Sequence, residues 1–184
     1  RASPLWQQRL FVTAFPRLTD AATAALAATA ATVAPLMAML LLAKSVPRSV
    51  LESELPTVMT AAVRALGSGD SDGGGGGSAP LARCALETLL ALCNGDDIDA
   101  IVSPHVPTLV PKLLELTRRV EPAGPRTRIY ALQVLRELAR LPYPRLHPHR
   151  PAVARGLAAA LDDRRRVVRQ AAARARNDWL VLRS

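Results

Sequence analysis

The sequence predicts an all-α chain built from paired helices, and three observations lead to this prediction. Apolar residues recur every three or four positions in most segments, which is the spacing of one helix face. No segment alternates polar and apolar residues for long enough to form a strand. Prolines separate the helical segments at regular intervals. With 49% apolar and 21% charged residues, the 184-residue chain can bury a core.

Eight helical segments are expected, in four consecutive pairs. The pairs are 5–18 with 33–43, 55–66 with 81–92, 107–118 with 126–140, and 151–161 with 164–182. Three of the segments show the helical spacing most clearly, through Leu109, Leu113 and Leu116, through Ile129, Leu132, Leu135 and Leu138, and through Val168, Ala171, Ala172, Ala175 and Trp179.

The stretch 21–43 needs separate interpretation, because its 23 residues carry no charge and so match the length of a membrane span. Residues 21–32 are Ala and Thr with one Leu, Pro35 follows, and only 36–42 is strongly apolar. We therefore expect a buried helix that follows a loose Ala/Thr connection, and no membrane span.

Residues 67–78 read GSGDSDGGGGGS, a composition that favours a flexible exposed loop. A phosphate-binding loop would need a Lys followed by Ser or Thr, opening a helix after a strand, and both the Lys and the strand are missing here.

The prolines reveal an internal repeat. Pro56, Pro107 and Pro151 are anchors, each expected in the first turn of a helix, where a missing N–H costs little. Equivalent residues stand nine before the anchors (Pro47, Ile98, Pro142), five before (Leu51, Val102, Leu146), two after (Val58, Leu109, Val153) and seven after (Val63, Leu114, Ala158). The gaps are 51 and 44 residues, and the surplus of seven is about the size of the Gly-rich insertion.

A period near 44 falls in the roughly 40 to 47 residue window of HEAT-type helix pairs. The sequence therefore predicts a HEAT-repeat α-solenoid of three and a half to four antiparallel helix pairs, with units at about 1–44, 45–93, 94–140 and 141–184 in a single domain 1–184. Stacked pairs would share one core, and their second helices would line a concave face, the usual binding surface of such arrays. We expect the chain to be part of a longer solenoid.

Two cysteines cannot form a disulfide framework. Cys84 and Cys93 lie nine residues apart in one helical segment, on opposite faces, so they should neither bridge nor share a metal. This usage predicts a reduced, intracellular chain.

Catalytic and metal-binding patterns are absent from the sequence. His105, His147 and His149 have no neighbouring Cys or carboxylate that would complete a metal site. Asp96, Asp97 and Asp99 cluster in a turn, but a calcium loop would need further oxygen ligands at fixed spacing. We assign the histidines to a solvated turn and the aspartates to capping, and predict no enzyme, no metal and no cofactor.

The charge pattern is more informative, since 22 Arg and 2 Lys oppose 15 acidic residues and leave a net charge of +9. Arginines recur on the exposed faces of the two helices at 126–140 and 164–182. The predicted partner-binding residues are Arg128, Arg136, Arg140, Arg165, Arg166, Arg174 and Arg176. The alternative is that these arginines only solvate the array.

Asp163 and Arg169 receive a different assignment. They stand six apart across the turn between paired helices, a spacing typical of HEAT units in which Asp and Arg form an inter-repeat ladder. We therefore expect both residues to be structural.

A basic surface could bind phosphates or acidic proteins. The six aromatic residues are scattered, so no stacking platform for single strands is expected, and no helix-turn-helix or zinc-finger signature is present. Carboxylates of a partner protein would match guanidinium groups equally well.

The run 161–182, LDDRRRVVRQAAARARNDWLVL, resembles the carboxy-terminal end of the methyl-methanesulfonate-sensitivity (MMS) nucleotide excision repair family. The shared residues are Asp162, Asp163, Arg164, Arg165, Arg169, Ala172, Ala175, Arg176 and Trp179, together with the upstream turn Arg140 to Pro142. The part after Ser103 carries the resemblance, and before it only the repeat pattern persists.

The resemblance implies a non-catalytic role. Members of this family are the large scaffold subunits of the cytosolic iron–sulfur protein assembly (CIA) targeting complex. Their carboxy-terminal domain docks a small assembly-factor subunit and a WD-repeat propeller. The complex hands iron–sulfur clusters to client proteins of DNA replication and repair, which implies a cytoplasmic and nuclear location and no membrane attachment.

Two other functions fit the same residues. One is a HEAT-repeat adaptor of another pathway, such as nuclear transport or phosphatase assembly. The other is a nucleic-acid-associated HEAT domain that binds phosphates through its arginine-rich face, whose affinity would fall steeply as salt rises.

Overall fold

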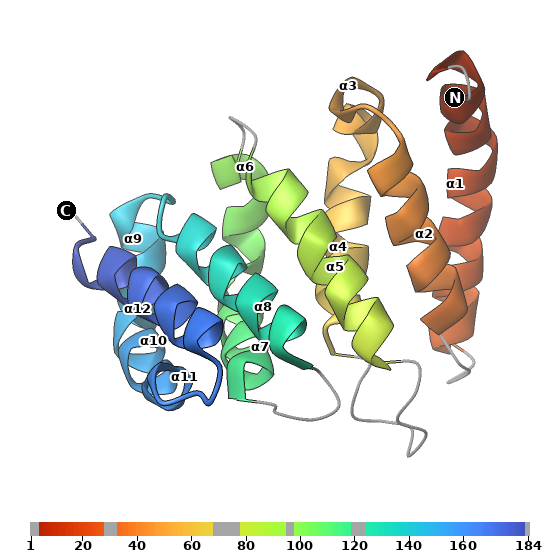
Figure 1. Ribbon diagram of the computed structural model, residues 1–184. Coiled ribbons are helices and arrows are strands. Elements are labelled where there is room, and N and C mark those ends of the chain that lie inside the picture. The colour runs from red at the N-terminus through yellow and green to blue at the C-terminus, as the bar shows by residue number, and fades with distance from the viewer. Residues whose placement is uncertain (1–3, 28–32, 68–77, 95–97, 119–123, 183–184) are drawn as a thin grey trace. The chain divides into compact units, whose positions relative to one another are not determined.

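The computed structural model describes residues 4–27, 33–67, 78–94, 98–118 and 124–182 (Figure 1). Within these segments the chain forms α-helices, short 3-10 helices and turns, with no strand among them. The prediction of an all-α helical repeat is confirmed. The chain divides into two compact units, Arg1–Thr88 (unit 1) and Leu89–Ser184 (unit 2).

Unit 1 begins with two packed helices. Its elements are α1 (Pro4–Ala27), α2 (Val33–Ser45), α3 (Arg48–Leu51), η1 (Glu52–Glu54), α4 (Leu55–Ala65) and most of α5 (Ser78–Cys93), inside which the unit boundary falls. Helix α2 packs against both α1 and α4. Buried Phe11 and Phe15 stack with ring centroids 4.7 Å apart, and Leu40 and Met59 are fully buried.

Unit 2 contains the basic part of the chain. Its elements after α5 are α6 (Ile98–Val102), η2 (Ser103–His105), α7 (Val106–Arg118), α8 (Gly124–Leu138), α9 (Tyr143–Leu146), η3 (His147–His149), α10 (Arg150–Gly156), α11 (Ala158–Leu161) and α12 (Arg166–Leu180). Helix α8 packs on α7 and on α12, and α12 also packs on α10 and α11. The last two helix pairs therefore share one core.

The same local structure occurs three times. A short helix, a 3-10 turn and a longer helix follow one another as α3–η1–α4, α6–η2–α7 and α9–η3–α10. The anchors Pro56, Pro107 and Pro151 each occupy the second position of the longer helix. The N–H groups of the first turn have no partner within the helix, so proline loses no helical hydrogen bond there. The predicted proline anchors are confirmed.

Two of the four equivalent positions of the repeat are buried in all three repeat units, whereas Ala158, seven after its anchor, is exposed. Leu51, Val102 and Leu146 are buried before the anchors, and Val58, Leu109 and Val153 are buried after them. These two positions hold each short helix and the first turn of each long helix against the core.

The expected helix 151–161 is two helices, α10 and α11, so this prediction is wrong in detail. The break follows Gly156, whose backbone lies so close to Leu114 that an added Cβ would stand 2.8 Å from a leucine methyl. Glycine also lowers helix propensity. Leu157 then bridges the two helices by accepting hydrogen bonds from Ala160 and Leu161.

The expectation of a loose connection at 21–32 is wrong for residues 21–27, because α1 continues to Ala27. Alanine is the best helix former, and it outweighs the lower propensity of threonine here. The Thr19 and Thr23 hydroxyls donate to the carbonyls one turn earlier, so neither side chain competes with the helix. Residues 28–32, and residues 68–77 of the expected Gly-rich loop, lie outside the described part of the chain.

None of the described helices combines the length and the hydropathy that a membrane crossing requires. Cys84 and Cys93 are both buried in α5 as free thiols. Burial raises the pKa of the Cys84 thiol, and burial together with the nearby Glu137 carboxylate raises the pKa of Cys93 to about 12.

Candidate functional site: the arginine surface of α8 and α12

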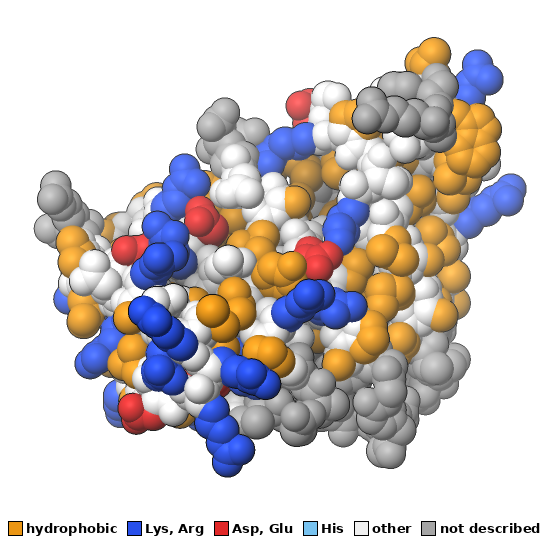
Figure 2. Space-filling view, viewed as in Figure 1, with side chains coloured by type: hydrophobic (Ala, Val, Ile, Leu, Met, Phe, Trp, Pro, Cys, Tyr) orange, Lys and Arg blue, Asp and Glu red, His pale blue; other side chains and the backbone are white. Residues whose placement is uncertain are grey.

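Helices α8 and α12 carry or border all seven arginines predicted to bind a partner. They lie side by side in unit 2 and form its largest helix–helix contact. Figure 2 shows blue Lys and Arg side chains gathered over these two helices, with few red carboxylates among them. The seven arginines nevertheless differ in burial and in the bonds that they make.

Arg128 is not part of an exposed surface, and its prediction as a partner-binding residue is corrected here. Its side chain is 5% exposed, and its Nε lies 2.9 Å from Oδ2 of Asp163. Its Nη2 also donates to Oδ1 of Asp163 at 3.3 Å. Arg128 therefore joins the third helix pair to the turn that opens the last helix of the fourth.

Asp163 forms an ion pair with Arg128 of the preceding helix pair, and not with the predicted partner Arg169. Its Oδ1 also accepts the backbone N–H of Arg165 at 2.8 Å. Arg169 donates to the backbone carbonyls of Asp163 at 2.8 Å and Arg164 at 3.2 Å. Arg169 is thus structural within the turn before α12, and does not reach the neighbouring repeat unit.

Arg136 and Arg140 are exposed, as predicted, and each is already paired. Arg136 Nε donates to Oδ2 of Asp178 on α12 at 2.8 Å. Arg140, which follows the end of α8, donates to Oε2 of Glu137 at 3.2 Å. Each of these bonds uses one nitrogen of the guanidinium, so further N–H groups of both exposed side chains can still face a partner.

Arg165, Arg166, Arg174 and Arg176 behave as predicted for an accessible basic surface. All four are exposed, and none makes a side-chain hydrogen bond or ion pair with another described residue. The same holds for Arg126 on α8 and Arg164 in the turn, which were not singled out from the sequence. We call these six residues the open arginines.

The carboxylates of α8 and α12 are paired within the unit. Glu137 is the one acidic residue of α8 and Asp178 is the one acidic residue of α12, and both are paired with arginine. Unit 2 as a whole contains 17 basic and 9 acidic residues, a formal charge of +8, whereas unit 1 contains 7 basic and 6 acidic residues, a formal charge of +1. The net positive charge of the chain is therefore concentrated in unit 2.

Buried contacts hold α12 in place beneath its exposed arginines. Val168, Ala172, Ala175 and Trp179 form its buried face. Trp179 Nε1 donates to the Leu135 carbonyl of α8 at 2.7 Å. In a continuing helix the Ala139 N–H would donate to the Leu135 carbonyl, but at the end of α8 it donates to the Arg136 carbonyl instead. The indole N–H therefore satisfies an acceptor that the helix end leaves without a backbone donor.

The C-terminal end of α12 is fixed in a similar way. Arg150 of α10 donates through Nη2 to the carbonyl of Leu180 at 2.7 Å. A cation beside the last carbonyls of a helix also interacts favourably with its dipole. Helix α12 is thus hydrogen-bonded to both of its neighbours, α8 and α10.

The N-terminal end of α12 is electrostatically unusual. Arg164, Arg165 and Arg166 surround its positive pole, where acidic residues are normally favoured. The Asp163 carboxylate, which accepts the Arg165 N–H, offsets only part of this charge. Such clustering of like charge at a helix N-terminus costs stability.

The histidines and the aspartate cluster do not form a site in the described residues. His147 and His149 lie in η3, and the His147 ring packs on Tyr143 with centroids 5.2 Å apart. Asp99 lies in the first turn of α6 and accepts a hydrogen bond from the Ser103 hydroxyl, while Asp96 and Asp97 lie outside the described residues. Across the described residues, no three potential ligands gather closely enough to hold a metal ion.

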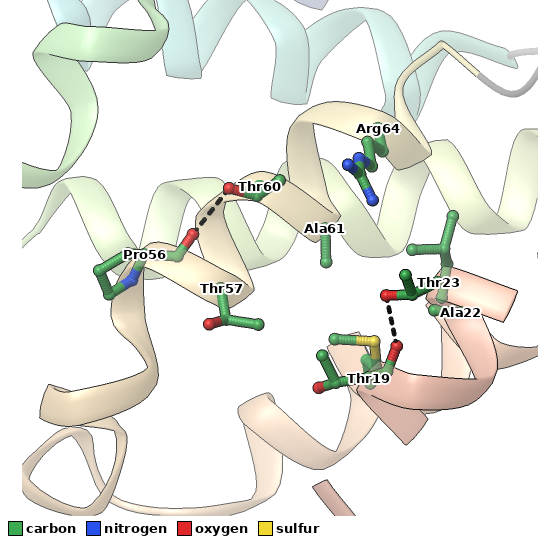
Figure 3. A pocket seen from close by; sticks show the side chains of 10 residues that line it. Thr19, Ala22, Thr23, Pro56, Thr57, Thr60, Ala61 and Arg64 are labelled. Atoms are coloured by element: carbon green, nitrogen blue, oxygen red, sulfur yellow. Dashed lines mark hydrogen bonds between the residues drawn. The ribbon is translucent and has the colours of Figure 1, made fainter. Parts of the chain in front are cut away.

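Unit 1 contains a pocket of about 300 Å³ between α1, α2 and α4 (Figure 3). Its floor includes the buried Leu36 and Met39, and Figure 3 shows threonines and Arg64 around it. The hydroxyls of Thr23 and Thr60 donate to carbonyls of their own helices, both at 2.9 Å. The residues that line this pocket provide neither a general base nor an activated nucleophile.

Comparison with known proteins identifies the family. A family model described as RNAPII transcription regulator C-terminal (MMS19_C) matches residues 2–139. The human MMS19 nucleotide excision repair protein homolog is 33% identical over 183 residues, and the bovine homolog is 34% identical over 180 residues. Both alignments cover 98% of this chain and 16% of the relative.

More distant relatives align over the same extent. The Dictyostelium discoideum homolog is 26% identical over 181 residues, covering 97% of this chain and 16% of the relative. The chain therefore spans about a sixth of the length of the curated relatives that it matches.

The extent of the family match corrects one expectation from the sequence. The resemblance was assigned to the part after Ser103, yet the family model matches residues 2–139 and the relatives align along nearly the whole chain. The first two helix pairs are therefore included in the likeness. The chain belongs to the family described as RNAPII transcription regulator C-terminal, the carboxy-terminal family of the MMS19 proteins.

Proposed function

We propose that this chain is a non-catalytic scaffold of the CIA targeting complex. In this role it docks the small assembly-factor subunit and the WD-repeat propeller, and helps to deliver iron–sulfur clusters to apo-proteins of DNA replication and repair. Family membership supports a role in DNA repair and transcription, because the relatives carry the name nucleotide excision repair protein and the family model the name transcription regulator.

The single observation that carries the docking proposal is the set of open arginines. Four of the seven residues predicted from the sequence, Arg165, Arg166, Arg174 and Arg176, are exposed and unpaired among the described residues. Guanidinium groups bind carboxylates through two parallel hydrogen bonds, which makes arginine well suited to acidic protein surfaces. Charge complementarity of this kind sets association rate and specificity more than raw affinity.

The chemistry of the described residues favours scaffolding over catalysis. The two thiols are buried, and burial raises the pKa of each, so neither is an activated nucleophile. The pocket of unit 1 is lined by threonines, apolar side chains and one arginine. A scaffold needs a shaped, charged surface and no ligand for the cluster itself.

Phosphate binding is the second candidate function, because unit 2 has a formal charge of +8. Sequence-independent binding to single strands usually adds exposed aromatic side chains on which bases stack. In unit 2, however, Trp179 is fully buried, and Tyr130 and Tyr143 are partly buried. We therefore prefer a protein partner, and propose a cytoplasmic and nuclear location in which the chain meets its clients.

Co-elution tests this proposal. The 184-residue chain is mixed at near-physiological salt with the purified small assembly-factor and propeller subunits, and a duplex DNA of about 20 base pairs is run in parallel. A protein complex without a DNA complex is the expected result. DNA binding that disappears at high salt, without any protein complex, would reject the scaffold and favour the phosphate-binding function.

A further inference from the structure

On the outer faces of α8 and α12, three apolar side chains and one glutamine lie between arginines. On α8, Ile129 and Gln133 lie on the side away from the core. On α12, Val167 is 54% exposed and Ala171 is partly exposed. We define these four residues as the trough, and Figure 2 shows apolar side chains among the arginines over these helices.

The contacts between the two helices show how these residues are placed. Arg136 bonds to Asp178, 42 positions later, and Leu135 bonds to Trp179, 44 positions later. Near the start of α8, Arg128 reaches Asp163, 35 positions later, so the two helices run in the same direction with an offset that changes along them. Ile129 and Val167 both lie in the first halves of these neighbouring helices.

Three of the open arginines lie beside the trough, and the one carboxylate on each of its two helices is already paired. Arg126 and Arg166 lie at the end where both helices begin, and Arg174 lies one helical turn beyond Ala171. The ion pair between Arg136 and Asp178 closes the opposite end. No unpaired carboxylate of α8 or α12 would therefore repel an acidic ligand.

We infer that this trough binds a short acidic segment of a partner protein, with one apolar side chain of that segment resting on Val167 and Ile129. The inference rests on the proposed function in taking the partner to be a protein. The 15-residue α12 is about 22 Å long. An extended segment of about seven residues would span the same length.

The apolar component distinguishes this site from a purely electrostatic one. Val167 keeps more than half of its surface exposed, and covering it would be favourable. A phosphate backbone offers no apolar group for this contact. A peptide with alternating carboxylate and apolar side chains offers both kinds of group.

Fluorescence anisotropy with two short labelled peptides tests the inference on the complete 184-residue chain. One probe contains Glu and Asp with two Leu, and the other has Ser in place of Leu. At physiological salt we expect the Leu peptide to bind the wild-type chain about fivefold more tightly than the Ser peptide. The variant Val167→Ser should abolish this difference without changing the net charge.

Two charge-matched variants locate the binding surface. Arg166→Glu with Arg174→Glu should weaken both peptides at least tenfold, because two attractive contacts become repulsive. The control variant, Arg145→Glu with Arg155→Glu, changes the net charge by the same amount, but on α9 and α10, away from the trough. It should bind both peptides nearly as the wild type does. Circular dichroism establishes that every variant retains its helices.

Three results would overturn the inference: equal binding of both peptides to the wild-type chain, unchanged binding by the Arg166/Arg174 variant, or no binding of the Leu peptide. Tighter binding of duplex DNA, lost in the same variant, would instead assign the arginines to phosphates. If the peptides do not bind but the chain co-elutes with the two subunits, the trough is rejected and the scaffold proposal stands. If the Leu peptide binds but the chain does not co-elute with the subunits, the assignment to the targeting complex is rejected and the binding site for an acidic segment stands.

Discussion

The guanidinium of Arg128 lies 2.9 Å from the carboxylate of Asp163, and both side chains are less than 10% exposed. This ion pair connects α8 with the turn before α12, 35 residues later in the chain. The same carboxylate accepts the Arg165 N–H, and Arg169 binds the carbonyls of the same turn. The start of the arginine-rich helix is therefore held by one buried ion pair from the preceding repeat unit and by exposed hydrogen bonds within the turn itself.

Replacing Arg128 by Ala should destabilise the chain by about 3 to 5 kcal/mol, because the buried Asp163 carboxylate would lose its counter-ion. Arg136→Ala is the matched control, since this residue lies on the same helix and pairs with Asp178 at an exposed position, where an ion pair contributes about 1 kcal/mol or less. Urea unfolding measures both values. Equal losses for the two variants would show that the buried pair has no special structural role.

Trp179→Phe should destabilise the chain by about 1 to 3 kcal/mol, because the Leu135 carbonyl would lose the indole N–H and remain buried. Trp6→Phe serves as the control, since Trp6 is 61% exposed and should contribute little. The free energy of unfolding in urea distinguishes the two. A Trp179→Phe variant as stable as the wild type would mean that this hydrogen bond does not support the end of α8.

Gly124→Ala should destabilise the chain by about 1 to 2 kcal/mol. Gly124 opens α8 with a φ of 68°, a left-handed conformation that costs this much for residues with a Cβ. Space is not limiting, because an added Cβ would meet no atom within 4 Å. Thermal unfolding of Gly124→Ala and Gly124→Asn tests the explanation, since asparagine tolerates this conformation and should lose less stability than alanine.

The buried thiol of Cys93 should make stability depend on alkaline pH. Burial and Glu137 raise its pKa from 9.0 to about 12, so the folded chain retains the thiol proton that the unfolded chain releases. The resulting stability is complete below about pH 9 and is lost as pH rises toward 12. Urea midpoints at several pH values measure this slope, which should be smaller in Cys93→Ala.

The repeat could be predicted from the sequence because its anchors are local. Pro56, Pro107 and Pro151 mark the first turns of α4, α7 and α10 without any knowledge of the tertiary structure, since proline is tolerated there and disfavoured in a helix interior. The helix bounds follow from the apolar spacing. The break after Gly156 could not be predicted, because it depends on the approach of Leu114 from another helix.

The arginine predictions also divide into those that the local sequence decides and those that tertiary packing decides. Arg128, Arg136 and Arg140 are spread over about 120° of the helix circumference, so a shared face is only approximate. Arg128 lies at the edge next to the core, and the position of Asp163 there determines its burial. The arginines of α12 were assigned correctly to an exposed surface because its buried face, Val168, Ala172, Ala175 and Trp179, is continuous in the sequence.

The most direct test of the account is the dissociation constant of the 184-residue chain for the purified pair of small assembly-factor and propeller subunits. It is measured for the wild type, for Arg166→Glu with Arg174→Glu, and for Arg145→Glu with Arg155→Glu. The account predicts that the first variant binds at least tenfold more weakly while the second binds as the wild type does. Equal weakening of both variants, or none in either, would contradict a specific role for the open arginines of α12.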